Sequence, residues 1–351
     1  MYKRQVLAAS VPLVLFIVAS VNPSSWSFIG LTTCWIALHA VAVTPRRQRA
    51  RRFAAALLAV AGAWLASVAR GDTAPFVAII VVAVALASLR GRDWVWLGAA
   101  LASVGVGVAS MLTSGQASGV APTGVGHDDA LFVLGHDLTE ILQVPFGVLG
   151  LPPWGALGWL DLPMPSTVVV PMLALAGFLI YTGLTSLERR RELALLGVGG
   201  ALLVLPFYML MRNLDLAGIQ PRYFMALVPL FFALTLWRNG GSESVTIGRA
   251  QGVLAWLSLT IAQSVALLTV LRRYTTGLGG TYWPGIDATW WWASGPTPGT
   301  WWVTGTVAFG VLALAFIPGL VPGVSGGLLR RPDAVAGGVA AGGAGAAGSE
   351  D

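Results

Sequence analysis

Residues 113–166 read TSGQASGVAPTGVGHDDALFVLGHDLTEILQVPFGVLGLPPWGALGWLDLPMPS, and they form the only long polar interruption in a very apolar chain. This segment contains acids and two of the three histidines, but no lysine or arginine. The sequences on both sides of it are apolar over lengths that can cross a bilayer. Acids and imidazoles gathered at one face of a membrane indicate a site.

The composition excludes a soluble protein. Only 10% of the residues are charged and 56% are hydrophobic, with a mean hydropathy of +0.76, whereas soluble domains have about 25% charged residues. The net charge of +6 comes from short arginine clusters between apolar runs, a pattern that indicates orientation in a membrane. We therefore expect membrane lipids as partners and no nucleic acid. Cys34 is the single cysteine, so no internal disulfide can form.

The apolar runs predict an all-α, polytopic helix bundle, because helices satisfy their own backbone hydrogen bonds where water is absent. About ten spans are expected, the first of them a retained segment rather than a cleaved signal peptide. The predicted spans are Val6–Val21, Phe28–Val43, Phe53–Ala69, Pro75–Leu89, Trp94–Leu112, Thr167–Thr185, Leu193–Met211, Tyr223–Trp237, Val253–Leu271 and Trp301–Val321. Two of these, Pro75–Leu89 and Tyr223–Trp237, are shorter than usual.

The arginines predict the topology. With the N-terminus in the cytoplasm, most Lys and Arg fall in cytoplasmic segments. An even number of spans then places both termini of this cell-membrane protein in the cytoplasm. The outer loops are then 113–166, 212–222 and 272–300. The basic residues predicted to lie on the outer side are Arg70, Arg212, Arg222, Arg272 and Arg273. The bundle is expected to occupy residues 1–332. Residues 333–351 are Gly- and Ala-rich and are expected to form a disordered cytoplasmic tail.

The 113–166 loop predicts one further helix. Asp128 or Asp129 can cap its start, apolar residues follow from Leu131 to Leu142, and Pro145 stops the pattern. His136, Glu140 and Gln143 share the other face, so the helix is amphipathic and is expected to lie on the outer membrane surface.

Arg222 is the main candidate for ligand binding, within Gln220-Pro221-Arg222-Tyr223. An arginine at the outer mouth of a bundle offers a planar fork of donors that suits a phosphate or pyrophosphate. The alternative is a snorkelling arginine that pairs with lipid phosphate or with Asp215.

Three aspartates are candidate catalytic residues. Asp161 lies just before a span between prolines, where it could act as a fixed base or simply cap the following turn. Asp128 and Asp129 could bind a divalent cation or supply a base, or could only cap a helix. The cofactor thus stays open, with a divalent cation as one candidate. Trp290, Trp291 and Trp292 are either an interfacial belt or a stacking surface for a sugar or lipid.

Two segments carry a resemblance to a known family. FGVLGLPPWGALGWLDLPMPS resembles a GxFGWLDxxxP motif, and IQPRYFMALVPLFF resembles a QGRYFLPLLPL motif, of bacterial membrane proteins of unknown function of the DUF2142 type. That family is grouped with the GT-C glycosyltransferases. The resemblance covers roughly Trp94 to Val321, the later part of the family's length. On the motifs fall Trp159, Leu160, Asp161, Pro165, Gln220, Arg222, Tyr223 and Phe224.

The resemblance implies a GT-C-like membrane glycosyltransferase, or the C-terminal part of one. Such an enzyme would take a sugar from a polyprenyl phosphate at the extracytoplasmic face and transfer it to an envelope glycan or lipid. Arg222, Gln220, Tyr223, Trp159 and Trp291 would then bind substrate. GT-C enzymes usually carry an acid in a large outer loop after the first span, and residues 22–27 leave no room for one. The resemblance therefore implies either that the chain is an N-terminally truncated piece or that the 113–166 loop supplies the acid.

Two alternatives remain open. An O-antigen ligase or polymerase also works on lipid pyrophosphates outside the membrane. A transporter, flippase or assembly scaffold would need no catalysis at all.

Overall fold

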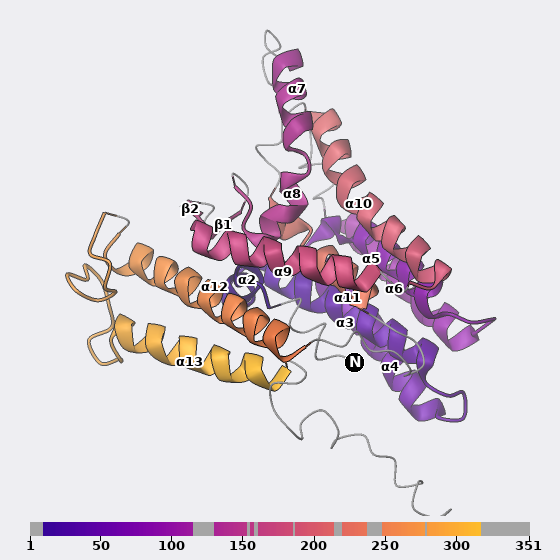
Figure 1. Cartoon of the computed structure of the whole chain (residues 1–351). Coiled ribbons are helices and arrows are strands. Elements are labelled where there is room, and N and C mark those ends of the chain that lie inside the picture. The colour runs from indigo at the N-terminus through magenta and orange to yellow at the C-terminus, as the bar shows by residue number, and fades with distance from the viewer. Residues whose placement is uncertain are drawn as a thin grey trace, which may run out of the picture.

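The computed structural model describes residues 10–114, 130–152, 155–157, 161–184, 187–213, 220–236, 248–277 and 279–316. It is an all-α bundle of long helices, with one short antiparallel strand pair (Figure 1). The predicted fold class is therefore confirmed. The tail 333–351 lies outside the described residues.

The predicted spans coincide with helices in the described parts of the chain. The α-helices are α2 (Pro12–Ala19), α3 (Pro23–Val43), α4 (Arg49–Ala69), α5 (Ala74–Ser88), α6 (Trp94–Thr113), α7 (Ala130–Glu140), α8 (Gln143–Phe146), α9 (Ser166–Leu184), α10 (Arg189–Asn213), α11 (Leu227–Leu236), α12 (Arg249–Thr275) and α13 (Pro298–Phe316). Three 3₁₀ turns, η1 (Gly71–Thr73), η3 (Gly147–Leu149) and η4 (Pro221–Tyr223), and strands β1 (Ala156–Leu157) and β2 (Leu162–Pro163) complete the described elements.

Within these described residues, eight helical segments are long and apolar enough to cross a membrane. The turn η1 lengthens the short α5 segment to 18 residues, Gly71–Ser88. The other short segment, α11, has only ten residues, and the described part of the first predicted span, α2, has eight. At about 1.5 Å per residue, the described part of each is shorter than a hydrocarbon layer of about 30 Å.

Helices α3 and α4 form the closest pair in the bundle because small residues line their contact. A Cβ added at Gly30 would lie 2.5 Å from the Gly62 carbonyl oxygen, so the two backbones nearly touch. Ala59, Ala63 and Ala66 on α4 are fully buried. Small residues let membrane helices approach and gain van der Waals contact where the hydrophobic effect contributes little.

The remaining helices pack around this pair. Helix α6 packs on α4, and α5 packs on α3 and α6. Helix α10 then packs on α5 and α11, α9 on α11 and α12, and α13 mainly on α12 (Figure 1).

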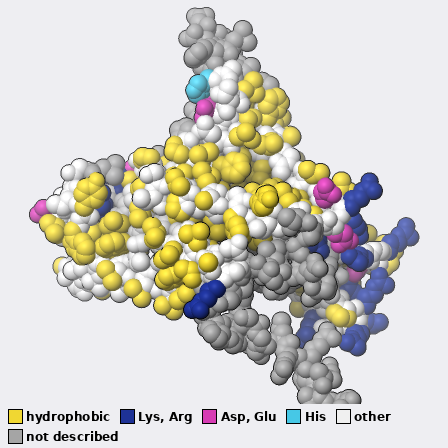
Figure 2. Space-filling view, viewed as in Figure 1, with side chains coloured by type: hydrophobic (Ala, Val, Ile, Leu, Met, Phe, Trp, Pro, Cys, Tyr) yellow, Lys and Arg dark blue, Asp and Glu magenta, His cyan; other side chains and the backbone are white. Residues whose placement is uncertain are grey.

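The bundle has two chemically different ends. At one end Arg46 donates to the Arg92 carbonyl oxygen, Arg52 pairs with Asp93, and Arg90 pairs with Glu188. Figure 2 shows Lys and Arg side chains gathered at this end. The long helices run alternately between this arginine-rich end and an opposite, pocket-bearing end that holds Ser24, η1, η4 and the start of α9. The alternation is the one expected from the arginine distribution, and its orientation relative to the cytoplasm stays a prediction.

Helix α7 is the helix expected in the 113–166 loop. It extends away from the bundle in Figure 1 and touches α10. It ends at Glu140, earlier than the sequence pattern suggested, because the chain turns at residues 141–142 before α8 begins. Its position on a membrane surface stays a prediction.

Candidate functional site

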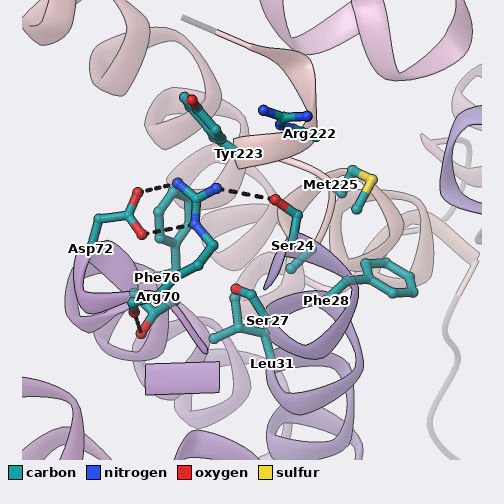
Figure 3. Close-up of a pocket in the computed structure, with 12 residues that line it drawn as sticks. Ser24, Ser27, Phe28, Leu31, Arg70, Asp72, Phe76, Arg222, Tyr223 and Met225 are labelled. Atoms are coloured by element: carbon teal, nitrogen blue, oxygen red, sulfur yellow. Dashed lines mark hydrogen bonds and ion pairs between the residues drawn. The ribbon is translucent and has the colours of Figure 1, made fainter. Parts of the chain in front are cut away.

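A small pocket opens at the end of the bundle opposite the arginine-rich end (Figure 3). It joins segments that are far apart in the sequence: the start of α3, the η1 turn with the start of α5, and the η4 turn. Its lining residues are Ser24, Ser27, Phe28, Leu31, Arg70, Asp72, Thr73, Phe76, Arg222, Tyr223, Met225 and Ala226.

Arg70 is held by three contacts at the floor of this pocket. Its Nε donates to Asp72 Oδ1 at 2.9 Å and its Nη2 to Asp72 Oδ2 at 2.5 Å. Its Nη1 donates to Ser24 Oγ at 3.1 Å. This paired geometry matches the fork of the guanidinium to both carboxylate oxygens, so Asp72 neutralises Arg70.

The η1 turn fixes the position of this ion pair. Helix α4 ends at Ala69, and Thr73 Oγ1 then donates to the Arg70 carbonyl oxygen at 2.9 Å and to Ser67 Oγ at 3.1 Å. On the facing helix, Asn22 caps α3 by accepting from the Ser24 backbone N–H at 2.9 Å. Both partners of Arg70 therefore come from hydrogen-bonded helix ends, which preorganises the pocket.

Tyr223 lies against both arginines. The Arg70 Cζ is 4.2 Å from the centroid of the Tyr223 ring and the Arg222 Cζ is 5.9 Å from it. Both distances are within the range of a cation–π contact. In Figure 3 the Arg222 guanidinium lies away from the Arg70–Asp72 pair, toward Met225.

Arg222 differs from Arg70 because none of the described residues provides it with a counter-charge, and Asp215, its alternative partner, lies outside the described residues. Its Nε is buried and has no hydrogen-bond partner among the described residues, and the same holds for Gln220 Oε1. Among the described residues, the charged side chains that line the pocket are Arg70, Asp72 and Arg222, and their charges sum to one net positive charge. A buried donor without a partner is costly, so this position suits an anion or a bound polar group.

The pocket is small. Its volume of about 10 Å³ has room for roughly one water molecule. It can therefore receive a single polar group, such as one oxygen of a phosphate, while the remainder of a larger ligand must lie outside its mouth.

The structure brings together some of the predicted site residues. Gln220, Arg222 and Tyr223 meet at η4, as their proximity in sequence requires. Asp161 is not among the described residues that line this pocket, and the hypothesis that it shares a cavity with Arg222 stays a prediction. Asp161 lies in the turn before β2 and accepts from Arg273 Nε at 2.7 Å, with both side chains well exposed.

Of the other predicted site residues, the structure describes only Trp291. Asp128, Asp129 and Trp159 lie outside the described residues. Trp291 lies between α12 and α13, where its Nε1 donates to the Pro296 carbonyl oxygen at 2.8 Å. In the described part of the chain, no three His, Cys, Asp or Glu side chains gather as metal ligands. The nearest approach is His136 Nδ1, 3.3 Å from Asp137 Oδ1.

Sequence reasoning missed Arg70, Asp72 and Ser24 as site residues. The signal was present in ARGDTAP, residues 69–75, where an arginine and an acid interrupt two apolar runs. Arg70 had been assigned to the same face as Arg222, but only as part of the charge count. Only the packing of α3, α4 and α5 shows that these loops share one pocket.

The fold and the composition define a polytopic membrane protein. The family model described as "Predicted membrane protein (DUF2142)" matches residues 2–231, and the chain belongs to this family. The match includes every pocket residue and ends before α12. It differs from the expected extent, Trp94 to Val321, because it includes the first helices and excludes the last two. No curated protein and no solved structure matches the chain.

Proposed function

We propose that this chain is a membrane glycosyltransferase of GT-C type that uses a polyprenyl-phosphate-linked sugar at its extracytoplasmic end. The observation that carries the proposal is that Arg222 has no acidic partner among the described residues, whereas the neighbouring Arg70 is neutralised by Asp72. Arg222 would bind the donor phosphate, whose oxygens accept charge-assisted hydrogen bonds from a guanidinium. Tyr223 would keep the guanidinium in place.

The charge of the pocket favours a monophosphate linkage. A sugar joined to a lipid through one phosphate carries one negative charge, which matches the net charge of the described pocket residues. A pyrophosphate linkage carries two negative charges and would leave one of them uncompensated. This supports the glycosyltransferase over the ligase or polymerase alternative.

Asp72 is the one carboxylate among the described residues that line the pocket. When a phosphate approaches the pocket, it competes with Asp72 for the donors of Arg70. The released carboxylate can then accept a proton from an acceptor hydroxyl as a general base. Asp161, Asp128 and Asp129 remain hypotheses for the same role or for binding a divalent cation, and an envelope glycan or lipid remains the proposed acceptor.

The experiment compares lipid-linked sugars in cells that lack the chain and in cells that carry Arg222→Ala, Arg222→Lys or Arg90→Ala. We expect Arg222→Ala cells to accumulate a polyprenyl-monophosphate sugar to the level of the null cells, measured by mass spectrometry. Arg222→Lys should restore part of the turnover, since a lysine keeps the charge but loses the paired geometry. Arg90→Ala is the control, because Arg90 is exposed at the arginine-rich end, opposite the pocket.

Other outcomes identify the alternatives. Accumulation of a pyrophosphate-linked oligosaccharide would favour the ligase or polymerase. Normal lipid-linked sugars in all strains, with cellular function kept after Asp72, Asp128, Asp129 and Asp161 are neutralised, would favour the transporter, flippase or scaffold.

A further inference from the structure

The segment between α12 and α13, residues 276–297, exposes a cluster of aromatic rings. Trp290 is 56% exposed, Trp292 is 58% exposed and Tyr282 is 82% exposed. The Trp292 ring centroid lies 4.8 Å from those of both Trp290 and Trp291, at interplanar angles of 64° and 70°. The exposed Trp290 and Trp292 rings therefore form a corner rather than a flat layer. We call residues 279–297 the aromatic loop.

Hydrogen bonds hold the aromatic loop in one shape. Arg272 donates from Nε to the Thr281 carbonyl oxygen and from Nη2 to the Gly280 carbonyl oxygen, both at 3.1 Å, and its Cζ lies 4.3 Å from the Tyr282 centroid. Thr289 donates from its backbone N–H and from Oγ1 to the Thr275 carbonyl oxygen, at 2.8 and 2.9 Å. The bond from Trp291 to Pro296 closes the far side. A ligand would therefore meet preorganised rings.

Helix length places these rings above the hydrocarbon. The apolar part of α12 between Arg249 and Arg272 has 22 residues and is about 33 Å long, which matches a hydrocarbon thickness of about 30 Å. Arg272 thus marks the boundary, and Trp301 and Trp302 in the first turn of α13 suit the interfacial belt. Trp290 follows Thr289, which is bonded to Thr275, the last residue of α12. Trp290 and Trp292 accordingly stand at or beyond the headgroup level.

The charge of the aromatic loop argues against docking on anionic lipids. Asp287 is the only charged residue between Arg273 and Arg330, and it is exposed with a φ of 57°. Loops that bind an anionic membrane surface carry Lys or Arg instead. An exposed carboxylate three residues before the exposed Trp290 suits a polyhydroxylated ligand, which offers hydroxyl donors and C–H faces that pack on aromatic rings.

We propose that the aromatic loop is a carbohydrate-binding site in which Trp290 and Trp292 pack against a sugar ring and Asp287 accepts hydrogen bonds from its hydroxyls. The site lies outside the residues matched by the family model. It is separate from the Arg222 pocket and holds whether or not that pocket transfers a sugar.

The test measures binding of soluble tetrasaccharides of glucose, mannose, galactose and N-acetylglucosamine to the full chain in lipid nanodiscs, by calorimetry and saturation-transfer NMR. We expect at least one tetrasaccharide to bind. Trp290→Ala and Trp292→Ala should each weaken binding by about tenfold. Asp287→Asn should weaken it less, because asparagine also tolerates a positive φ but lacks the charge. The control is Trp94→Ala, which removes a 72% exposed indole at the arginine-rich end and should change nothing.

Three results would overturn the proposal. The first is that no tetrasaccharide binds. The second is that the Trp290→Ala/Trp292→Ala double variant, with unchanged thermal stability, binds as tightly as the wild type. The third is that lipids brominated on their acyl chains quench the fluorescence of the wild type more than that of the double variant. The rings would then be inserted in the membrane and would serve as an anchor.

Discussion

The two ends of the bundle use the same residue types for different purposes. At the arginine-rich end, Arg52 donates to Asp93 and to the Val41 carbonyl oxygen, and the side chains of the ion pair are only 7% and 11% exposed. At the pocket-bearing end, the Arg70 and Asp72 side chains are 19% and 37% exposed, and Arg222 adds a positive charge for which the described residues offer no counter-charge. A matched and buried ion pair joins helices, whereas an excess charge in an open pocket is available to a ligand.

Asp93 shows how the arginine-rich end is stabilised. Burial by itself raises the pKa of the Asp93 carboxyl, but the hydrogen bonds from Arg52 and the Trp96 backbone N–H, with the charges of Arg52 and Arg46, outweigh it. The net pKa is lower than the ordinary value of 3.8. Asp93 also caps α6, so one carboxylate connects α4, the α3 end and α6.

The largest effect is expected from Gly30→Leu, which would separate α3 from α4, the helices whose ends form the pocket-bearing end. The Gly62 carbonyl oxygen and the Ala66 backbone nitrogen lie 2.5 and 2.7 Å from the position of a Cβ, and both are backbone atoms that cannot rotate away. We expect a loss of about 4 kcal/mol or more, measured by thermal unfolding in detergent. Gly98→Ala is the control, since nothing lies within 4 Å of its Cβ. Equal stability of the two variants would contradict the close α3–α4 contact.

Asp93→Asn tests the buried Arg52–Asp93 ion pair of the arginine-rich end and should have the next largest effect on stability. It leaves Arg52 buried without a counter-charge, for a loss of about 3 kcal/mol at neutral pH. The double variant Arg52→Met/Asp93→Asn should recover most of that loss, because no unpaired charge remains. If the single and double variants unfold alike, the ion pair does not join these helices.

The same carboxylate predicts a pH dependence. Because the folded-state pKa of Asp93 lies below its ordinary value of 3.8, the carboxylate stabilises the fold above that value. This stabilisation is lost as the pH falls through the lowered pKa. The difference in thermal stability between the wild type and Asp93→Asn should therefore be constant near neutral pH and shrink below pH 3.8; a difference that grows in acid would refute it.

The smallest effect is expected from Arg273→Ala, which removes an exposed ion pair and so allows comparison with the buried Arg52–Asp93 pair. Its pairing with Asp161 is 2.7 Å long, but the side chains are 42% and 37% exposed. Water and salt screen such a pair, so we expect less than about 1 kcal/mol, and less still in high salt. A loss comparable to that of Asp93→Asn would mean that β2 and α12 depend on this contact.

Particular residues show where sequence reasoning succeeded and where it stopped. The apolar runs predicted the membrane helices, and Arg222 was singled out because an arginine at a membrane boundary is chemically conspicuous. Asp161 was chosen for its neighbouring prolines and tryptophans, and local sequence carries no information that Arg273, on α12, would be its partner. Arg70 and Asp72 were overlooked as a site because two charges in a short loop are common.

The sequence by itself determined that this is an all-α membrane protein whose helices alternate between an arginine-rich end and a second end. It did so because the bilayer selects each apolar segment by its length and orients it by the arginines beside it. Both effects act on one segment at a time and need no tertiary contact. Only the tertiary structure decided that Ser24, Arg70, Asp72, Arg222 and Tyr223 share one pocket. These residues meet because α3 and α4 pack closely through Gly30 and Gly62. Composition and periodicity do not predict such a contact between segments that are far apart in the sequence.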